Sequence, residues 1–249
     1  MKRALSFLFV LFAASLALAA PREESVTFPG GSGKGMGLLV TPEGKGPFPA
    51  VLVIQEWWGM DEWMKNRARA LAKEGYVALA VDLYHGKSTN KEEEAHQLMM
   101  GLDRGQALQD LADAFNFLAS RPDVRKERIG TLGFCMGGMY ALALATQEPR
   151  LAAVVAYYGL PPTDPAAIAR IKAPVMGNYG AKDQGPSPEQ VRTFETEMKK
   201  DGKTIDVKLY DGAGHAFANE NNPWGGYREA AARDAWSRTT RFLDANLKK

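Results

Sequence analysis

The sequence contains a single cysteine, Cys135, among its 249 residues, so no disulfide can form within the chain. An excess of charge of one sign is also missing. Without residues 1–19, which hold Lys2 and Arg3 but no acid, the chain has 29 basic and 29 acidic residues. A net charge near zero gives no general attraction for nucleic acid or anionic lipid. We therefore expect no nucleic-acid partner.

Several motifs of cofactor and metal proteins are absent. The sequence has neither a G-x-G-x-x-G after a strand nor a G-x-x-x-x-G-K-[ST] loop, which argues against a nucleotide cofactor. It has only three histidines, and no set of histidines, cysteines and acids has the spacing of metal ligands. We expect no cofactor and no metal site.

The N-terminus has the form of a secretory signal peptide. Two basic residues, Lys2 and Arg3, precede a segment from Ala4 to Ala19 that is apolar except for two serines. The small residues Ala17 and Ala19 form an A-x-A cleavage site. The alternative is an uncleaved anchor, but the run of roughly 16 residues is short for a span of ~20. We predict that residues 1–19 are removed and that the protein is exported to the periplasm or medium, with no membrane attachment afterwards.

The remaining chain alternates short apolar runs with helical patterns. Runs of this kind are typical of strands buried on both faces of a parallel sheet. Strands are expected at 50–54, 76–81, 128–132, 152–158, 173–179 and 205–210, after an antiparallel hairpin within 26–46. Helices are expected at 64–74, 91–118 with a break near Gly101 or Gly105, 136–147, 165–170, 188–200 and 226–247. This pattern predicts an α/β fold, with a mostly parallel sheet covered on both faces by helices, as one domain over residues 20–249.

The strongest candidate for a reactive group is Cys135. It lies in Gly133-Phe134-Cys135-Met136-Gly137, a G-x-C-x-G sequence between a predicted strand and a predicted helix. This is the form of a nucleophile elbow with cysteine in place of serine. The sulfur would sit at a helix N-terminus, which favours a thiolate, and the next backbone N–H, on Met136, could donate to an oxyanion. The alternative is an inert buried cysteine in a glycine-flanked turn.

Partners for this nucleophile follow in the chain order of an α/β-hydrolase: nucleophile, acid, histidine. Asp183 comes a few residues after the predicted strand 173–179, and His215 follows the strand 205–210 in a glycine-rich loop. Each residue alone would be an ordinary loop residue, but the order of all three predicts a catalytic triad. The other histidines, His85 and His96, have no such pattern and are interpreted as surface or structural residues.

Glu56 is a fourth candidate. It follows the apolar run that ends at Ile54, so its carboxylate could face the pocket and tune a nearby thiol or histidine. The alternative is a solvated loop charge.

These motifs together resemble those of the dienelactone hydrolase family. The shared segments are Gln55-Glu56, Asp82-Leu83-Tyr84, Gly133-Phe134-Cys135-Met136-Gly137-Gly138, Tyr157-Tyr158-Gly159, Asp183 and Gly214-His215-Ala216-Phe217. The resemblance covers about residues 25–245 and implies an α/β-hydrolase fold with a triad of Cys135, His215 and Asp183. It also implies that Glu56 helps to control ionisation of the thiol, and that the backbone N–H groups of Trp57 and Met136 form the oxyanion hole.

The sequence departs from this family where a carboxylate-bearing lactone would be held. Two arginines bind that carboxylate in the founding members, but the matching positions here are Asn219 and Glu92. Three tryptophans, Trp57, Trp58 and Trp63, follow the first core strand and indicate either an apolar or aromatic substrate group or packing of the next helix. We expect the substrate pocket to include Trp58, Tyr84, Phe134 and Asn219.

The sequence therefore predicts a hydrolase of small esters or lactones that acts as a monomer on a small-molecule substrate. Two other functions remain open. One is a non-catalytic binding protein of hydrolase fold, which would have no need of all three triad residues. The other is a redox-sensing thiol at Cys135, which would lack a resolving cysteine.

Overall fold

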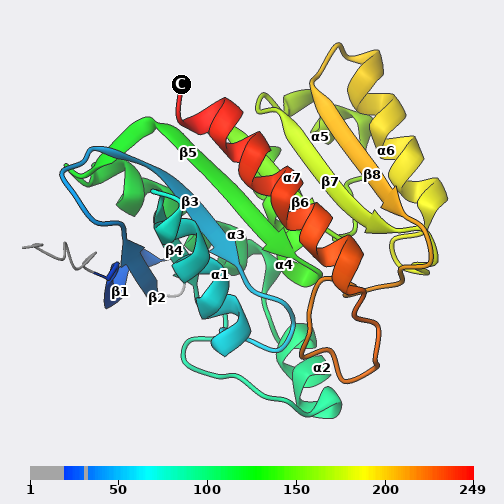
Figure 1. The fold of residues 1–249 in the computed structure, drawn as a ribbon, viewed down its shortest axis with the longest axis horizontal. Helices are drawn as coiled ribbons and strands as arrows, with labels where there is room; N and C mark the ends of the chain where they lie inside the picture. The colour runs from blue at the N-terminus through cyan, green and yellow to red at the C-terminus, as the bar shows by residue number, and fades with distance from the viewer. Residues whose placement is uncertain (1–19, 31–32) are drawn as a thin grey trace, which may run out of the picture.

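The computed structural model describes residues 20–30 and 33–249. The predicted signal peptide lies outside the described residues. An eight-stranded sheet runs through the molecule in the order β1-β2-β4-β3-β5-β6-β7-β8 (Figure 1). Its strands are β1 Arg22–Gly30, β2 Gly33–Thr41, β3 Phe48–Ile54, β4 Val77–Val81, β5 Val124–Phe134, β6 Ala153–Tyr157, β7 Val175–Gly180 and β8 Ile205–Tyr210.

The sheet is parallel from β4 to β8. β1 and β2 form the predicted antiparallel hairpin, and β2 pairs antiparallel with β4. The remaining pairs, from β4 through β3, β5, β6 and β7 to β8, are all parallel. In the centre of the sheet, Ile54 of β3 lies opposite both Val81 of β4 and Gly133 of β5. The segments that follow these strands therefore meet at one edge.

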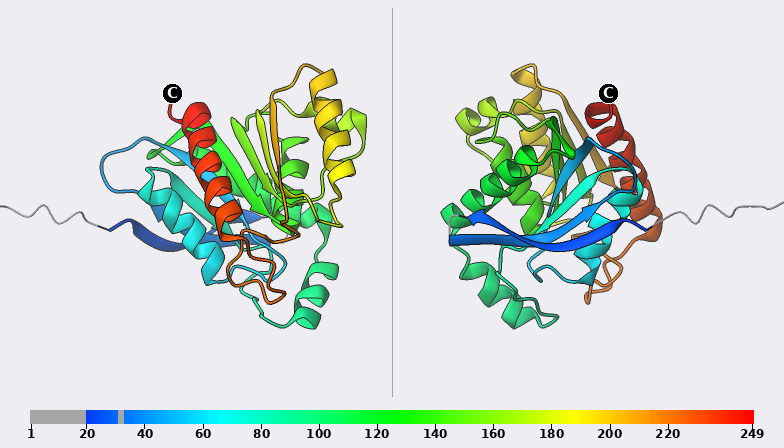
Figure 2. Two further views of the ribbon diagram at one scale, coloured as in Figure 1. Left: turned by 45° about the vertical axis from the view of Figure 1, so that its right-hand side comes forward. Right: turned by 90° about the vertical axis from the view of Figure 1, so that its left-hand side faces the viewer.

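Helices cover both faces of the sheet (Figures 1 and 2). They are α1 Glu62–Lys73, α2 Glu92–Met100, α3 Arg104–Ser120, α4 Met136–Ala145, α5 Pro165–Arg170, α6 Pro188–Lys200 and α7 Glu229–Leu247. α1 and α7 pack on one face, and α3, α4, α5 and α6 on the other. α2 lies beyond the edge where the parallel strands end (Figure 2).

β3 shows why the core strands read as continuous apolar runs. Its side chains alternate, so Leu52 and Ile54 enter the core under α3 and α4, whereas Val51 and Val53 enter the core under α1 and α7. All four are fully buried. A strand covered on both faces needs apolar residues at every position. The predicted fold class, a mostly parallel sheet with helices on both faces, is confirmed.

One expected helix break is present, and two expected element boundaries lie elsewhere. The predicted break in the helix 91–118 is confirmed, because a new helix, α3, starts at Arg104 after its N-cap Asp103, whose side chain accepts a hydrogen bond from the Gln106 backbone. β5 is longer than the predicted 128–132, since the charged residues at 125–127, two of them exposed, hide the strand pattern. α7 begins at Glu229 and not near Gly226, because Gly225, with φ of 64°, closes a turn just before it.

Candidate functional site

Cys135 sits in a strained turn between β5 and α4. Its backbone has φ of 52° and ψ of −117°, a region that non-glycine residues rarely adopt. A Cβ atom on Gly133 would clash with the carbonyl of Gly137, and one on Gly137 would clash with the carbonyl of Ile54. The two flanking glycines therefore allow the turn to pack tightly against β3. Strain of this kind is concentrated at functional sites.

The structure brings the three predicted triad residues together. His215, between β8 and α7, has Nε2 3.0 Å from Cys135 Sγ and Nδ1 2.9 Å from Asp183 Oδ2. Asp183, which follows β7, is buried, and its Oδ1 accepts a hydrogen bond of 2.9 Å from the Gly185 backbone. This bond fixes the carboxylate so that it orients the imidazole. The sulfur, the imidazole and the carboxylate thus follow one another in the order of a nucleophile, a base and an orienting acid.

Electrostatic interactions among these three side chains favour the protonated form of the His215 imidazole. Burial lowers the pKa of His215, but hydrogen bonds and electrostatic interactions with Asp183 and Cys135 outweigh it and raise the pKa to about 10. A protonated imidazole can donate a hydrogen bond from each ring nitrogen, one to the Cys135 sulfur and one to Asp183.

Glu56 is fully enclosed and is not a solvated loop charge. It is 2% exposed, and its two carboxyl oxygens accept hydrogen bonds from the Tyr158 hydroxyl at 3.0 Å and from the Asn219 amide at 2.6 Å. Burial raises the pKa of Glu56 to about 7, although both hydrogen bonds act to lower it. The group therefore changes charge near neutral pH, next to the triad histidine.

Tyr158 connects Glu56 to the triad, and sequence reasoning gave it no role. It follows β6, is fully buried and has φ of 39°. Its ring meets the His215 ring edge to face, with centroids 5.2 Å apart, while its hydroxyl reaches Glu56. The only indication in the sequence was the Tyr157-Tyr158-Gly159 segment at a strand end.

The two expected oxyanion donors belong to segments that adjoin the Cys135 turn, one directly after it in the chain and one after the neighbouring strand β3. Met136 is the first residue of α4, where backbone N–H groups have no partner within the helix. Trp57 comes three residues after Ile54, the partner of Gly133 in the neighbouring strand. Tyr84 lies next to this turn, because its hydroxyl is 3.4 Å from Met136 Sδ.

A cavity of about 470 Å³ is lined by two of the expected pocket residues, Trp58 and Asn219, and by none of the triad residues. Asn219 also donates its amide to Glu56, so that group is already engaged. The remaining lining residues are Asp61, Glu62, Trp63, Thr89, Asn90, Asn221 and Pro223. Two of them are acids and none is basic.

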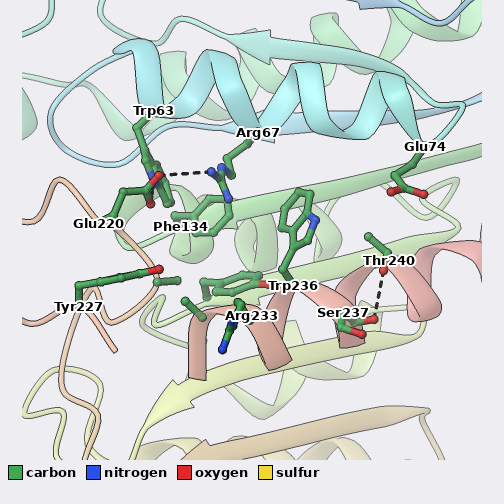
Figure 3. Close-up of a pocket in the computed structure, with 13 residues that line it drawn as sticks. Trp63, Arg67, Glu74, Phe134, Glu220, Tyr227, Arg233, Trp236, Ser237 and Thr240 are labelled. Atoms are coloured by element: carbon green, nitrogen blue, oxygen red, sulfur yellow. Dashed lines mark hydrogen bonds and ion pairs between the residues drawn. The ribbon is translucent and has the colours of Figure 1, made fainter. Parts of the chain in front are cut away.

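Phe134, another residue expected in the substrate pocket, does not line this cavity. Its ring packs 4.8 Å from Trp63 and 4.5 Å from Tyr157, measured between centroids, in the core under α1 and α7. There it lines a separate groove of about 420 Å³ between these helices, with Arg67 and Trp236 (Figure 3). Side chains alternate along β5, so Phe134 faces this side of the sheet.

The other residues singled out from the sequence lie at the surface or serve packing. Glu92 opens α2, is exposed and accepts a hydrogen bond of 3.2 Å from the indole N–H of Trp224. Trp63 is buried and donates from its indole to Glu220. The Nε2 atom of His85 lies 3.4 Å from Oδ2 of Asp110. His96 is exposed on α2.

Within residues 20–30 and 33–249, no group of three or more histidines, cysteines and acids is placed to hold a metal ion. In the same part of the chain, no helix has the length and apolarity needed to cross a membrane.

Comparison with known proteins gives consistent matches. The profile of the dienelactone hydrolase family matches residues 36–247. A Methylorubrum extorquens protein that bears the name carboxymethylenebutenolidase is 36% identical over 211 residues, which cover 79% of this chain and 72% of that protein.

Solved structures agree in fold. A dienelactone hydrolase-like promiscuous phosphotriesterase from metagenomic libraries matches with a TM-score of 0.84 and 26% identity, over 92% of this chain and 99% of that one. A Klebsiella pneumoniae structure named as a dienelactone hydrolase matches with a TM-score of 0.81 and 28% identity, over 90% and 99% of the two chains. The expected α/β-hydrolase fold is confirmed.

Proposed function

The chain belongs to the dienelactone hydrolase family, and we propose that it hydrolyses small carboxylic esters or lactones with Cys135 as the nucleophile. The observation that supports this most is the pair of contacts made by His215, 3.0 Å to the Cys135 sulfur and 2.9 Å to Asp183. These residues come from three separate strand ends, so simple chain proximity does not explain their meeting.

In the first half of the proposed reaction, the Cys135 thiolate attacks the carbonyl carbon and forms a C–S bond. The carbonyl oxygen becomes an oxyanion, to which the backbone N–H groups of Met136 and Trp57 donate. As the C–O bond to the leaving group breaks, the protonated His215 gives its proton to that oxygen. A thioester on Cys135 remains.

In the second half, water attacks the thioester carbonyl while the now neutral His215 takes its proton. The C–S bond breaks, the acid is released, and the thiolate–imidazolium pair forms again. Asp183 orients the imidazole and stabilises its charge throughout.

Glu56 is proposed to modulate the thiol. As a carboxylate it adds a negative charge close to the triad and disfavours the thiolate, whereas in its protonated form it is neutral. Its buried position between Tyr158 and Asn219 supports this role.

The intact triad favours an enzyme over a binding protein, because capture of a ligand needs no histidine between a thiol and a carboxylate. Turnover of a panel of p-nitrophenyl esters and lactones, with Cys135→Ala as the control, tests the proposal. Hydrolysis by the wild type and none by the variant supports it. A wild type without activity on the whole panel would favour the binding function.

We expect neutral substrates to be preferred over those with a free carboxylate. A charge-assisted hydrogen bond contributes ~1.5–3 kcal/mol, so its absence should cost at least about tenfold in kcat/KM. The Asn219 amide is engaged by Glu56, and the adjoining cavity is lined by Asp61 and Glu62. The measurement compares p-nitrophenyl pentanoate with the mono-p-nitrophenyl ester of glutaric acid, which has a similar length.

Glu92→Gln tests the same idea from the protein side, since removal of an exposed negative charge near the indole of Trp224 should narrow the difference in kcat/KM between the two esters. A wild type that prefers the anionic ester would show instead that a cation such as Lys87 or Arg104 reaches the substrate.

Export is proposed as well, with cleavage after Ala19. The mature protein should then begin at Ala20, because the small residues Ala17 and Ala19 meet the requirement of signal peptidase. N-terminal sequencing and intact mass of the protein from its native host decide this. A chain that keeps Met1 in the membrane fraction would contradict cleavage after Ala19.

We also propose that the mature protein is a monomer. Size-exclusion chromatography of the same sample tests this.

A further inference from the structure

We propose that Trp57, Trp58 and Trp224, here called the indole cluster, form a subsite for a neutral aromatic ring on the acyl group of the substrate, with Trp224 as the residue that sets this preference. The inference rests on the proposed function, because it names the kind of ester or lactone that the site accepts. Sequence reasoning did not include Trp224, which lies far along the chain from the other two tryptophans.

The three rings touch one another without stacking. Their centroids are 5.0 Å apart for Trp57 and Trp58, 5.6 Å for Trp57 and Trp224, and 5.9 Å for Trp58 and Trp224. The angles between the ring planes are 65°, 46° and 44° in the same order. Trp58 is 7% exposed but Trp224 is 50% exposed, so the open face of the cluster belongs mainly to Trp224.

Trp57 is the member of the indole cluster that lies nearest in the fold to the Cys135 turn. It follows β3 three residues beyond Ile54, and Ile54 pairs with Gly133, two residues before Cys135. The side chains of Trp57 and Cys135 pack against the same core. If the Trp57 N–H holds the carbonyl oxygen, then the acyl group, bonded to the same carbonyl carbon, extends beside the Trp57 indole. The leaving oxygen must instead face His215, which donates the proton.

The charges around the cluster select a neutral ring. Glu92 accepts a hydrogen bond from the Trp224 indole, and the cavity next to Trp58 is lined by Asp61 and Glu62 and by no basic residue. An aromatic ring against indole faces gains contact area and a favourable ring–ring geometry without an ionic partner. An anionic ring substituent would face the acids.

Trp224 differs from the other two members in how it is held. The Trp58 backbone carbonyl accepts a hydrogen bond of 2.9 Å from Thr89, and the next residue, Gly59, forms a bridge with Ser88. Trp224 belongs to the segment between β8 and α7, beyond the edge of the sheet (Figure 2), and its indole is tied by one exposed hydrogen bond to Glu92. Its side chain can therefore be replaced with little effect on the core.

The test compares p-nitrophenyl phenylacetate with p-nitrophenyl acetate, which share a leaving group and differ by one ring in the acyl group. In Trp224→Ala, kcat/KM for p-nitrophenyl phenylacetate should fall about tenfold. For p-nitrophenyl acetate it should fall by no more than about twofold, so that the ratio of the two values changes at least about fivefold. Trp224→Phe should restore most of the phenylacetate activity, because it keeps an aromatic face. Trp236→Ala, a tryptophan in the groove between α1 and α7, is the matched control and should leave the ratio of the two substrates unchanged.

Binding of both esters is also measured in a Cys135→Ala background, in which no thioester can form on residue 135. There, phenylacetate should bind more tightly than acetate, and Trp224→Ala should remove this difference. An unchanged substrate ratio in Trp224→Ala, or no preference for phenylacetate in binding, overturns the indole cluster as a subsite. Full activity in Cys135→Ala overturns the proposed function alone, since the binding comparison still reports on Trp224.

Discussion

Replacement of Cys135 by alanine is expected to lower kcat/KM for p-nitrophenyl acetate by at least about a thousandfold, as removal of the nucleophile does in enzymes with a catalytic triad. Alanine has no atom that can form the acyl intermediate. It also removes the hydrogen-bond partner of His215 Nε2, now 3.0 Å away. Steady-state kinetics on the purified variant measure the effect, with circular dichroism to show that it is folded.

The His215→Ala change should cause a loss of similar size, but the double variant should be little worse than either single one. Residues that act as a unit have non-additive effects, because the second change removes a group that no longer has a function. Additive losses for Cys135→Ala and His215→Ala would mean that the two side chains act independently, contrary to the proposed mechanism.

The Glu56→Gln change is expected to remove a large part of the pH dependence of stability. The pKa of Glu56 is raised from 4.5 to about 7 in the folded protein by burial. Between these two values the folded state holds a proton that the unfolded state has released, so wild-type stability falls as pH rises from about 4.5 to 7. The full fall is about 3 kcal/mol. Glutamine has no such charge and can still bond to Tyr158 and Asn219.

Urea unfolding of both proteins from pH 4.5 to 8 measures this. The difference in unfolding free energy should grow in favour of Glu56→Gln as pH rises and level off above about pH 7. Other titrating groups, such as His215, are common to both proteins. Glu127→Gln, which removes a carboxylate that is exposed on β5, should show the same pH dependence of unfolding free energy as the wild type. A constant difference between wild type and Glu56→Gln would mean that Glu56 does not change charge in this range.

Much of the fold and of the triad arrangement could be predicted because both depend on local sequence patterns. Leu52 and Val53 lie on opposite faces of β3 and are both apolar, which identifies a doubly covered strand. Such strands are parallel and end at one edge. Residues that follow parallel strands of one sheet, such as Cys135 after β5 and His215 in the loop after β8, are therefore brought close together even though they are far apart in sequence.

The contacts of long side chains could not be predicted in the same way. Asn219 was expected to face the substrate, but whether its amide also reaches Glu56 depends on the path of the segment after His215. Phe134 precedes the nucleophile directly, yet strand alternation turns it to the opposite face. Trp224 meets Trp57 and Trp58 only through the tertiary structure. No local pattern around residue 224 indicates partners so distant in sequence.

The most direct test of the central claim is to identify the covalent intermediate. The wild type is mixed with excess p-nitrophenyl phenylacetate, quenched in acid within the first turnovers and digested for peptide mass spectrometry. We expect a phenylacetyl group on the peptide that contains Cys135, with fragment ions that place it on the sulfur. Steady turnover with an unmodified Cys135, or with the acyl group on another residue, would contradict the assignment of Cys135 as the nucleophile.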